Sequence, residues 1–189
     1  MGFFSSLSSL FGLGKKQVHV VVVGLDNSGK TTILNQLKTP ETRTAQIVPT
    51  VGFNVSNVQT GNLVINAFDM AGQAKYRSMW ESYYSTAQGI VFVVDSSDKL
   101  RMPLARDELW MIMDHKDIAH KPVPILVLAN KMDEPEAMTS AEISVSLGLE
   151  VIRGHHWTIQ STCALNGVGL DKAMQWLSSE ILIYLETRK

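Results

Sequence analysis

The sequence predicts an α/β fold, in which a mostly parallel sheet of about six strands carries one antiparallel edge strand and has helices on both faces. Two observations support this prediction. From residue 18 onward, short runs of β-branched residues alternate with helical stretches, which is typical of a parallel sheet wrapped by helices. The chain also has 189 residues, of which 45% are hydrophobic, so one domain with a substantial core is expected.

Six strands are expected. Four of them are short apolar runs at residues 18–23, 89–95, 123–130 and 156–160. The other two, at residues 53–58 and 63–68, flank the segment Gln59-Thr60-Gly61-Asn62, whose glycine is typical of a hairpin turn. This hairpin accounts for the antiparallel edge strand.

Five helices are expected, at residues 30–37, 76–87, 101–114, 140–147 and 169–185. Pro40 ends the first of them. In the last helix, apolar side chains recur at helical spacing, which favours core contacts over a cofactor site. These side chains are Leu170, Ala173, Met174, Trp176, Leu177, Ile181 and Tyr184.

Composition and charge argue against several classes of function. The chain has 17 basic and 18 acidic residues and a net charge of -1, so no general attraction to nucleic acid is expected. The single cysteine, Cys163, forms no internal disulfide, and the first residues lack the features of a secretory signal. No apolar run approaches the roughly 20 residues that cross a bilayer. We therefore expect a monomeric, cytoplasmic protein.

A phosphate-binding loop follows the first strand and precedes the first helix. It matches the pattern G-x-x-x-x-G-K-[ST] with Gly24, Leu25, Asp26, Asn27, Ser28, Gly29, Lys30 and Thr31, and Thr32 comes next. Backbone N–H groups of such a loop cradle the phosphates, while Lys30 reaches the β- and γ-phosphates and the Thr31 hydroxyl binds Mg²⁺. The loop predicts a P-loop NTPase fold, but it leaves GTPases, ATPases and P-loop kinases open.

Two further segments are candidates for sensing the γ-phosphate. Asp69 closes a strand and is placed to hold a water on Mg²⁺, and Gly72 is placed to offer its N–H to the γ-phosphate. Gln73 follows directly, where its amide can orient the attacking water, so it is the candidate catalytic residue. Thr50, in the loop before the hairpin, is the second candidate metal ligand.

The motif Asn130-Lys131-Met132-Asp133 predicts that the nucleotide carries guanine. It lies at the C-terminal end of an apolar strand, where open α/β sheets bind ligands. The Asp133 carboxylate can accept hydrogen bonds from N1–H and the exocyclic amine of guanine. Asn130 is expected to bond the N7 side and tie the loop down, and the Lys131 stem to cover the base. After the last strand, Cys163 and Ala164 are expected near the base O6, with Ala164 N–H as donor and Cys163 as a buried small residue.

Together these motifs resemble the Arf and Arf-like branch of small GTPases over essentially the full chain. The resemblance is carried by G-L-D-N-S-G-K-T-T at 24–32, V-P-T-V-G-F-N-V at 48–55, F-D-M-A-G-Q at 68–73, Y-R-S-M-W-E-S-Y-Y at 76–84 and A-N-K-M-D at 129–133. Phe68 and Ala71 depart from Arf proteins proper, which carry Trp and Gly there. The resemblance implies a GTPase domain over residues 17–189 that switches between GTP and GDP. It also implies slow hydrolysis, an exchange factor and a GTPase-activating protein.

The resemblance further implies how the nucleotide state is communicated. The hairpin at residues 53–68 shifts register when GTP binds and expels the N-terminal helix from a groove, while Phe53, Trp80 and Tyr83 form an exposed aromatic surface for effectors. Within the branch, F-D-M at 68–70 and D-S-S-D-K-L-R-M at 95–102 look most like the Arf-like GTPase that recruits the BBSome coat to ciliary membranes. This implies a peripheral membrane protein at the cilium or basal body.

Residues 1–16 are expected to form an amphipathic helix that contacts a membrane surface, or alternatively one that simply packs on the domain. Serines lie largely opposite the apolar residues, and Lys15 and Lys16 end the segment. The first residues also fit the pattern M-G-x-x-x-[ST], which makes Gly2 a possible myristoylation site beside the bulky Phe3. The apolar residues of the segment are Phe3, Phe4, Leu7, Leu10, Phe11 and Leu13.

Another Arf-like role in vesicle trafficking is the alternative to BBSome recruitment, and two other functions compete with a GTP-hydrolysing switch. A nucleotide-dependent scaffold with negligible hydrolysis is compatible with Ala71, although Gln73 argues against it, and a P-loop kinase has no use for N-K-x-D. No internal arginine finger is evident, and Arg77 is expected to face solvent. His155 and His156 point to opposite faces of an extended chain, so we expect a surface or strand-entry role for them and no metal.

Overall fold

Six strands form one sheet in the order β2-β3-β1-β4-β5-β6 in the computed structural model, which describes residues 15–187. The β2–β3 pair is antiparallel and every other neighbouring pair is parallel. The predicted mixed sheet is therefore confirmed, with the hairpin at its edge. The strands are β1 (Lys16–Val23), β2 (Phe53–Thr60), β3 (Leu63–Met70), β4 (Gly89–Asp95), β5 (Ile125–Asn130) and β6 (Trp157–Ser161).

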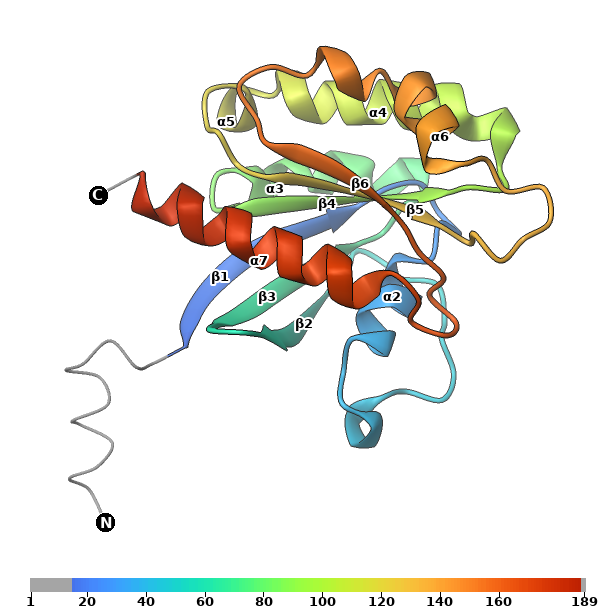
Figure 1. Cartoon of the computed structure of the whole chain (residues 1–189), viewed down its shortest axis with the longest axis horizontal. Coiled ribbons are helices and arrows are strands. Elements are labelled where there is room, and N and C mark those ends of the chain that lie inside the picture. Colours follow the sequence, from blue (N-terminus) through green and yellow to red (C-terminus); the bar gives the residue numbers. More distant parts are fainter. Residues whose placement is uncertain (1–14, 188–189) are drawn as a thin grey trace.

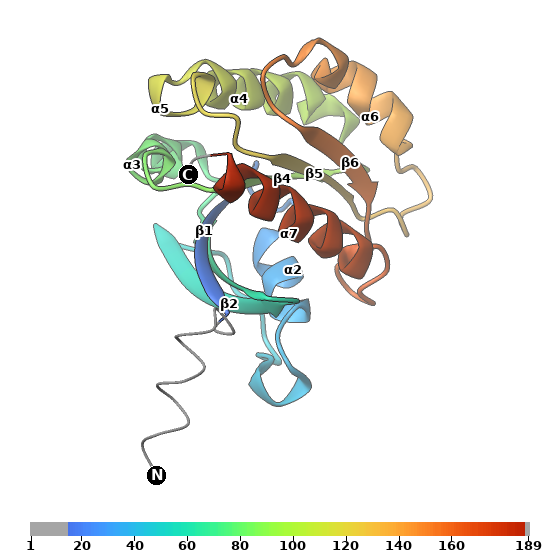
Figure 2. The same cartoon turned by 60° about the vertical axis from the view of Figure 1, so that its left-hand side comes forward.

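Helices cover both faces of the sheet, as Figures 1 and 2 show. Helices α2 and α7 lie on one face, and α3, α4, α5 and α6 lie on the other. The α-helices are α2 (Lys30–Gln36), α3 (Glu81–Tyr84), α4 (Met102–Asp114), α5 (Lys116–Ala119), α6 (Ser140–Leu147) and α7 (Leu170–Glu186). Short 3-10 helices are η1 (Pro40–Thr42), η2 (Ala74–Met79), η3 (Lys99–Arg101) and η4 (Leu149–Val151).

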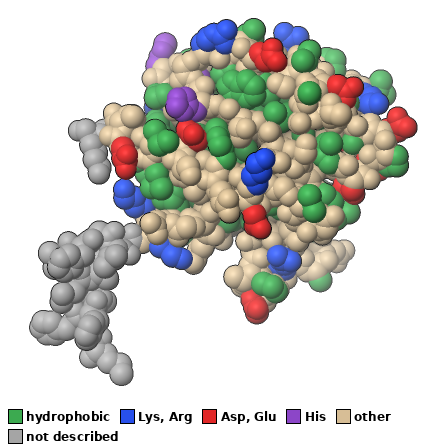
Figure 3. Space-filling view, viewed as in Figure 1, with side chains coloured by type: hydrophobic (Ala, Val, Ile, Leu, Met, Phe, Trp, Pro, Cys, Tyr) green, Lys and Arg blue, Asp and Glu red, His purple; other side chains and the backbone are tan. Residues whose placement is uncertain are grey.

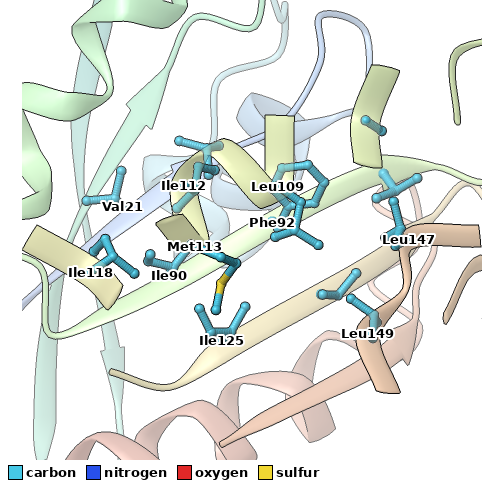
Figure 4. Packing of buried hydrophobic residues seen from close by; sticks show 14 of the residues in the cluster. Val21, Ile90, Phe92, Leu109, Ile112, Met113, Ile118, Ile125, Leu147 and Leu149 are labelled. Atoms are coloured by element: carbon cyan, nitrogen blue, oxygen red, sulfur yellow. The ribbon is translucent and has the colours of Figure 1, made fainter. Parts of the chain in front are cut away.

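The hydrophobic core has two layers, one on each side of the sheet, because successive strand residues point to opposite faces. Val21 and Val23 belong to the layer under α4, whereas Val20 and Val22 belong to the layer under α2 and α7. In the first layer, Leu109, Ile112 and Met113 of α4 pack over β4 and β5 (Figure 4). Strands β4 and β5 are buried along their whole length, as expected for central parallel strands.

The last helix carries the predicted apolar stripe. Six of its seven expected core residues are buried, and Trp176 is partly buried. A Cβ atom built at Gly89, the first residue of β4, would lie 3.2 to 3.4 Å from side-chain carbons of Leu177 and Ile181. Helix α7 therefore packs closely on the middle of the sheet at this glycine.

One predicted element differs in form. The single helix expected at residues 76–87 is the 3-10 helix η2 followed by the one-turn helix α3, and the two meet at Trp80. In a 3-10 helix, side chains three residues apart lie on the same side. Arg77 of η2 and Trp80, the residue that follows η2, both reach back to backbone carbonyls, those of Gly72 and Ala71 respectively. Helix α5 was not predicted at all.

Smaller differences concern the ends of elements. Strand β1 begins at Lys16, which pairs with Leu63, so the predicted N-terminal helix does not extend to residue 16. Residues 1–14, with Gly2 and the apolar residues of that helix, lie outside the described part of the chain. His155 is buried with Nδ1 3.1 Å from the Val123 carbonyl oxygen, and His156 lies 2.8 Å from Glu180.

The surface is mixed in character. Figure 3 shows basic and acidic side chains interspersed on one face of the protein. Among the described residues, no helix is both long enough and apolar enough to cross a membrane.

Candidate nucleotide-binding site

A pocket of about 310 Å³ opens where β1 and β3 end and their loops begin. It brings together most of the phosphate loop, Thr50, Gly72 and Gln73, as expected for a site at the carboxyl ends of parallel strands. The guanine-motif residues do not line it. They adjoin it through Asn130, whose side chain donates to the Ser28 carbonyl of the phosphate loop at 2.9 Å.

The phosphate loop needs its glycines because the backbone approaches its neighbours closely. Gly24 has φ 136° and Gly29 has φ 94°, both in the region that favours glycine. A Cβ atom at Gly24 would lie 2.2 Å from the Val93 carbonyl oxygen, and one at Gly29 would lie 2.3 Å from Asn130 Nδ2. Asn27, with φ 62°, takes the left-handed conformation without being glycine. The loop conformation thus depends on contacts with β4 and with the guanine motif.

Lys30 is buried at the first turn of α2. Its ammonium donates to the carbonyl oxygens of Gly24 at 2.9 Å and Leu25 at 2.8 Å. Burial lowers the pKa of Lys30 to about 8, although Asp69 and Asp26 act in the opposite direction. An ammonium has three donors, so one remains for an anion after these two bonds. A phosphate group would supply the negative charge that this buried cation lacks.

Three oxygen-bearing side chains converge at the pocket, two of which, Thr31 and Thr50, line it. Thr31 Oγ1 lies 2.9 Å from Thr50 Oγ1 and donates to Asp69 Oδ2 at 2.7 Å, and Thr50 Oγ1 lies 3.3 Å from the same carboxylate oxygen. Burial raises the pKa of Asp69, and hydrogen bonds from the threonines and the charge of Lys30 partly offset it. The second carboxylate oxygen, Oδ1, is buried without a hydrogen-bond partner among the described residues.

This cluster fits a magnesium ion. Mg²⁺ prefers hard oxygen ligands and keeps several waters, and an unpartnered buried carboxylate oxygen is costly without a cation nearby. In the described part of the chain, no group of three or more His, Cys, Asp or Glu side chains could hold a metal. The donors available for a metal are therefore two hydroxyls with one carboxylate, and the nucleotide phosphates would complete such a set.

Gly72 lies against the phosphate loop. A Cβ atom built at this residue would lie 2.3 Å from the Asp26 backbone nitrogen and 2.6 Å from the Gly24 carbonyl oxygen, so only glycine fits. Gln73 is exposed at the edge of the pocket, and in the described structure its side chain makes no hydrogen bond. Gln73 is therefore free to turn toward a bound nucleotide.

Asn130 joins three segments of the site. It is 1% exposed, and besides the bond to Ser28 its Oδ1 accepts from Ala164 N at 3.1 Å and Thr162 Oγ1 at 3.3 Å. The Ala164 N–H, predicted to serve the base O6, is thus engaged with Asn130 here. Asp133 is exposed and makes no hydrogen bond with the described residues, so its carboxylate is available to a ligand.

Lys131 is held by a neighbouring strand. It has φ 64°, and its ammonium donates to Asp95 Oδ2 at 2.6 Å. Burial acts to raise the pKa of Asp95, but hydrogen bonds from Lys131 and Ser97 outweigh it and hold that pKa below its usual value. This ion pair was not predicted. Cys163 is buried, in agreement with the expected small core residue.

The expected aromatic surface needs one correction. Trp80 is 1% exposed, and its indole N–H donates to the Ala71 carbonyl at 3.0 Å, so it belongs to the core. An aromatic cluster at the surface instead contains Phe53, which is exposed, and Phe68 and Tyr83, which are partly buried against the core. The ring centroids are 5.1 Å apart for Phe53 and Tyr83 and 4.8 Å for Phe68 and Tyr83. Phe68 is one of the half-buried positions that alternate with buried positions along β3.

Arg77 also departs from expectation. Its side chain is 13% exposed rather than facing solvent. Its Nε donates to the Gly72 carbonyl at 2.9 Å, and its Nη1 donates to Glu108 at 2.6 Å. No sequence pattern identifies a partner that lies 31 residues away.

Known proteins resemble this chain along its length. The sequence profile of the ADP-ribosylation factor family matches residues 3–181. The chain is 67% identical to the ADP-ribosylation factor-like protein 6 of Caenorhabditis elegans, with all of both chains aligned. The protein of that name from Danio rerio is 46% identical over 96% of this chain and 97% of its own.

A solved structure matches as well. It is described as the Arl6 BBS3 small GTPase from Trypanosoma brucei with the bound nucleotide analogue GppNp. The TM-score is 0.83 and the identity 38%, over 89% of this chain and 99% of the other. These matches indicate that the phosphate loop and N-K-x-D belong to an enzyme that binds guanine nucleotides and hydrolyses GTP. They argue against a scaffold without hydrolysis and against a P-loop kinase. The chain belongs to the ADP-ribosylation factor family of small GTPases.

Proposed function

We propose that this protein is a GTP-gated switch that attaches to membranes in its GTP state and recruits an effector coat there, the BBSome. The observation that carries the proposal is the meeting of Thr31, Thr50 and Asp69 at one point. It joins the phosphate loop to the exposed loop before β2 and to the end of β3. A ligand that strengthens or removes this junction changes the position of two surface segments.

Magnesium is the proposed cofactor. Thr31 and Thr50 would hold it directly and Asp69 through a water, and the ion would neutralise charge on the β- and γ-phosphates. Lys30 would contribute its remaining donor and Gly72 its N–H to the γ-phosphate. Asp133 would select guanine, with Asn130 holding the base loop against the phosphate loop.

Gln73 is the proposed catalytic residue, because its side chain is exposed at the pocket edge and makes no hydrogen bond with residues 15–187. Gln73→Leu removes the amide that would orient water. We expect GTP hydrolysis stimulated by an activating protein to fall at least about tenfold, with unchanged GTP affinity. Single-turnover hydrolysis measures the rate, and fluorescent-nucleotide titration measures the affinity. Lys75→Ala, on the exposed side of η2, is the matched control, and equal turnover in Gln73→Leu and the unsubstituted protein contradicts the assignment.

Membrane attachment and coat recruitment are supported by the resemblance to the Arf-like GTPase that recruits the BBSome coat. The relatives named ADP-ribosylation factor-like protein 6 and the solved structure described as Arl6 BBS3 agree with this resemblance. The amphipathic segment predicted at residues 1–16 would lie in the membrane interface, and Gly2 would add an acyl chain. The aromatic cluster of Phe53, Phe68 and Tyr83 would form the effector contact, since Phe53 and Phe68 lie on the hairpin and Tyr83 lies in α3, which follows η2. The protein would then be a cytoplasmic, peripheral membrane protein of the cilium or basal body.

The test uses the full chain loaded with GppNp or GDP. Flotation with vesicles containing anionic lipid and capture of purified BBSome are both expected with GppNp and largely lost with GDP. Tyr83→Ala should reduce BBSome capture without changing vesicle flotation, whereas Val145→Ala, exposed on α6, should change neither. Equal BBSome capture in both nucleotide states rules out the gating proposed here.

A further inference from the structure

Two arginines approach the same carboxylate of the phosphate loop from different elements. Arg101, at the end of η3, lies with Nη1 3.2 Å from Asp26 Oδ1, and Arg77, on η2, lies with Nη2 4.0 Å from that oxygen. Arg101 also pairs with Asp98. Arg101 therefore ties the phosphate loop to the start of α4, and Arg77 comes to the same point from the segment that follows Gly72.

Arg77 acts on the peptide group that follows Gly72. Its Nε donates to the Gly72 carbonyl, while Nη1 donates to Glu108 at 2.6 Å. Both side chains of the ion pair are largely shielded, 13% exposed for Arg77 and 14% for Glu108. A shielded, charge-assisted pair of this kind holds its geometry better than an exposed surface pair.

Helix α4 supplies a rigid anchor for this contact. Glu108 precedes Leu109, which is fully buried, and Ile112 is 1% exposed, so the helix is fixed in the core layer that Figure 4 shows. Residues 101 and 108 are seven apart, which places both on the same side of the helical segment. The side that carries Arg101 to the phosphate loop thus carries Glu108 to Arg77.

The peptide group before Gly72 is also held. The Trp80 indole donates to the Ala71 carbonyl at 3.0 Å. In a trans peptide the carbonyl and the N–H point in opposite directions, so fixing Ala71 C=O fixes the direction of Gly72 N–H. Gly72, whose Cα lies against the phosphate loop, is therefore held by one side chain on each side, Arg77 of η2 and Trp80 at the junction of η2 and α3.

We propose that Arg77 is a positioning residue for GTP binding: held by Glu108 of α4, it fixes the Gly72 carbonyl and so keeps Gly72 in place for the γ-phosphate. GDP has no γ-phosphate and does not need this placement. The Arg77–Glu108 pair therefore sets the preference for GTP over GDP and not the affinity for nucleotides in general. The proposal depends on GTP binding by the chain, and not on the membrane and coat functions above.

The test measures affinities of the purified full chain for GppNp and GDP without membranes. Glu108→Ala and Arg77→Ala are expected to weaken GppNp binding about tenfold, the loss of one charge-assisted hydrogen-bonded contact, with GDP binding changed less than about twofold. Glu180→Gln, which removes the His156–Glu180 pair on the other side of the sheet, should change neither affinity.

A charge-swapped double variant, Arg77→Glu with Glu108→Arg, separates positioning from simple stabilisation. It can restore an ion pair, and with it the melting temperature of the GDP form, but a glutamate cannot donate to the Gly72 carbonyl. We expect the melting temperature to recover and the GTP preference not to recover. Recovery of the preference in the swap, or equal losses for GppNp and GDP in the single variants, overturns the proposal. A single variant that fails to fold in its GDP form also overturns it, because the pair would then be structural.

Discussion

The two halves of the nucleotide site are built differently. In the base half, Asn130 is almost fully buried and bonds to the phosphate loop and to the segment after β6. In the switch half, residues 43–49 are exposed, and of residues 45–51, all of which the structure describes, Thr50 alone makes hydrogen bonds. The base half is therefore held together by hydrogen bonds of a buried side chain, whereas the loop of the switch half is fixed mainly by the hydrogen bonds of Thr50.

This difference has a physical consequence. Opening a segment held by few contacts costs little free energy, whereas opening a buried hydrogen-bonded junction leaves several polar groups unpaired. Substitutions in the base half should therefore affect GDP and GTP alike, and those in the switch half should affect GTP selectively. The following substitutions test that separation, beginning with the largest effect.

Asn130→Ala should have the largest effect, and it should not distinguish the nucleotides. The change leaves the Ser28 carbonyl and the Ala164 N–H unpaired in a buried place, at about 1 to 3 kcal/mol each. Affinity for both GDP and GppNp should fall by about a hundredfold or more. Titration with fluorescent GDP and GppNp measures it, and a loss confined to GppNp would contradict the division into two halves.

Gly72→Ala should affect the nucleotides unequally. A methyl group at this position meets backbone atoms of Asp26, Leu25 and Gly24 at 2.3 to 2.6 Å, and backbone cannot move aside easily. Overpacking of this kind costs about 1 to 3 kcal/mol, so GppNp affinity should fall about thirtyfold. GDP affinity should stay within about twofold, since without a γ-phosphate the segment around Gly72 can move away from the phosphate loop. Gly61→Ala, in the hairpin turn, has open space around its Cβ but a φ of 51°, so it tests whether backbone strain at a glycine far from the phosphate loop suffices.

The base half and the phosphate loop were predictable because their residues are close together in sequence. G-x-x-x-x-G-K-[ST] and N-K-x-D are contiguous patterns next to apolar strands, and the alternation of strands and helices indicated the sheet. The contacts of Arg77 with Glu108 and of Lys131 with Asp95 were not predictable, because ion pairs separated by 31 and 36 residues leave no periodic signal.

The segment that follows Gly72 and Gln73 in the switch half was also the part of the chain where the secondary structure was predicted wrongly. Residues 76–87 have an acceptable helical composition, yet the hydrogen bonds of Arg77 and Trp80 to the preceding carbonyls favour the tighter η2. Such tertiary contacts override local propensity. The burial of Trp80 could not be inferred either, because an aromatic residue in a short segment fits both a core and a surface.

Lys30, which is bonded within the phosphate loop, gives a pH-dependent effect. Its pKa of about 8 without nucleotide lies below the usual 10.5 because burial disfavours the ammonium. The unfolded chain then binds more protons between about pH 8 and 10.5, so this group makes the nucleotide-free protein more stable as pH rises through that range. Bound phosphates favour the ammonium, so nucleotide affinity should instead fall above pH 8, by up to about tenfold per pH unit.

Titrations with GDP and GppNp at intervals from pH 7 to pH 9 check this prediction. Lys30→Met has no ammonium. Its affinity for nucleotide should be weaker at every pH, but it should lack the fall above pH 8 that the titration of Lys30 causes. Ionisation of the nucleotide itself is common to both proteins and cancels in the comparison. A parallel decrease in the two proteins would show that Lys30 does not titrate in this range.

The smallest expected effect comes from a pair of matched substitutions, Thr162→Val and Thr50→Val, which each replace a hydroxyl by a methyl group. Thr162 donates one 3.3 Å hydrogen bond to Asn130 in the base half, worth about 1 kcal/mol, so Thr162→Val should weaken GDP and GppNp equally, by about fivefold. Thr50→Val removes a hydroxyl of the proposed magnesium cluster and should weaken GppNp by at least that factor, leaving GDP nearly unchanged. Affinities measured with and without Mg²⁺ sharpen the contrast, because only the Thr50 effect should depend on the ion. If Thr162→Val changed the ratio of GppNp to GDP affinity, the base half would have to move with the switch, and the halves would form a single unit.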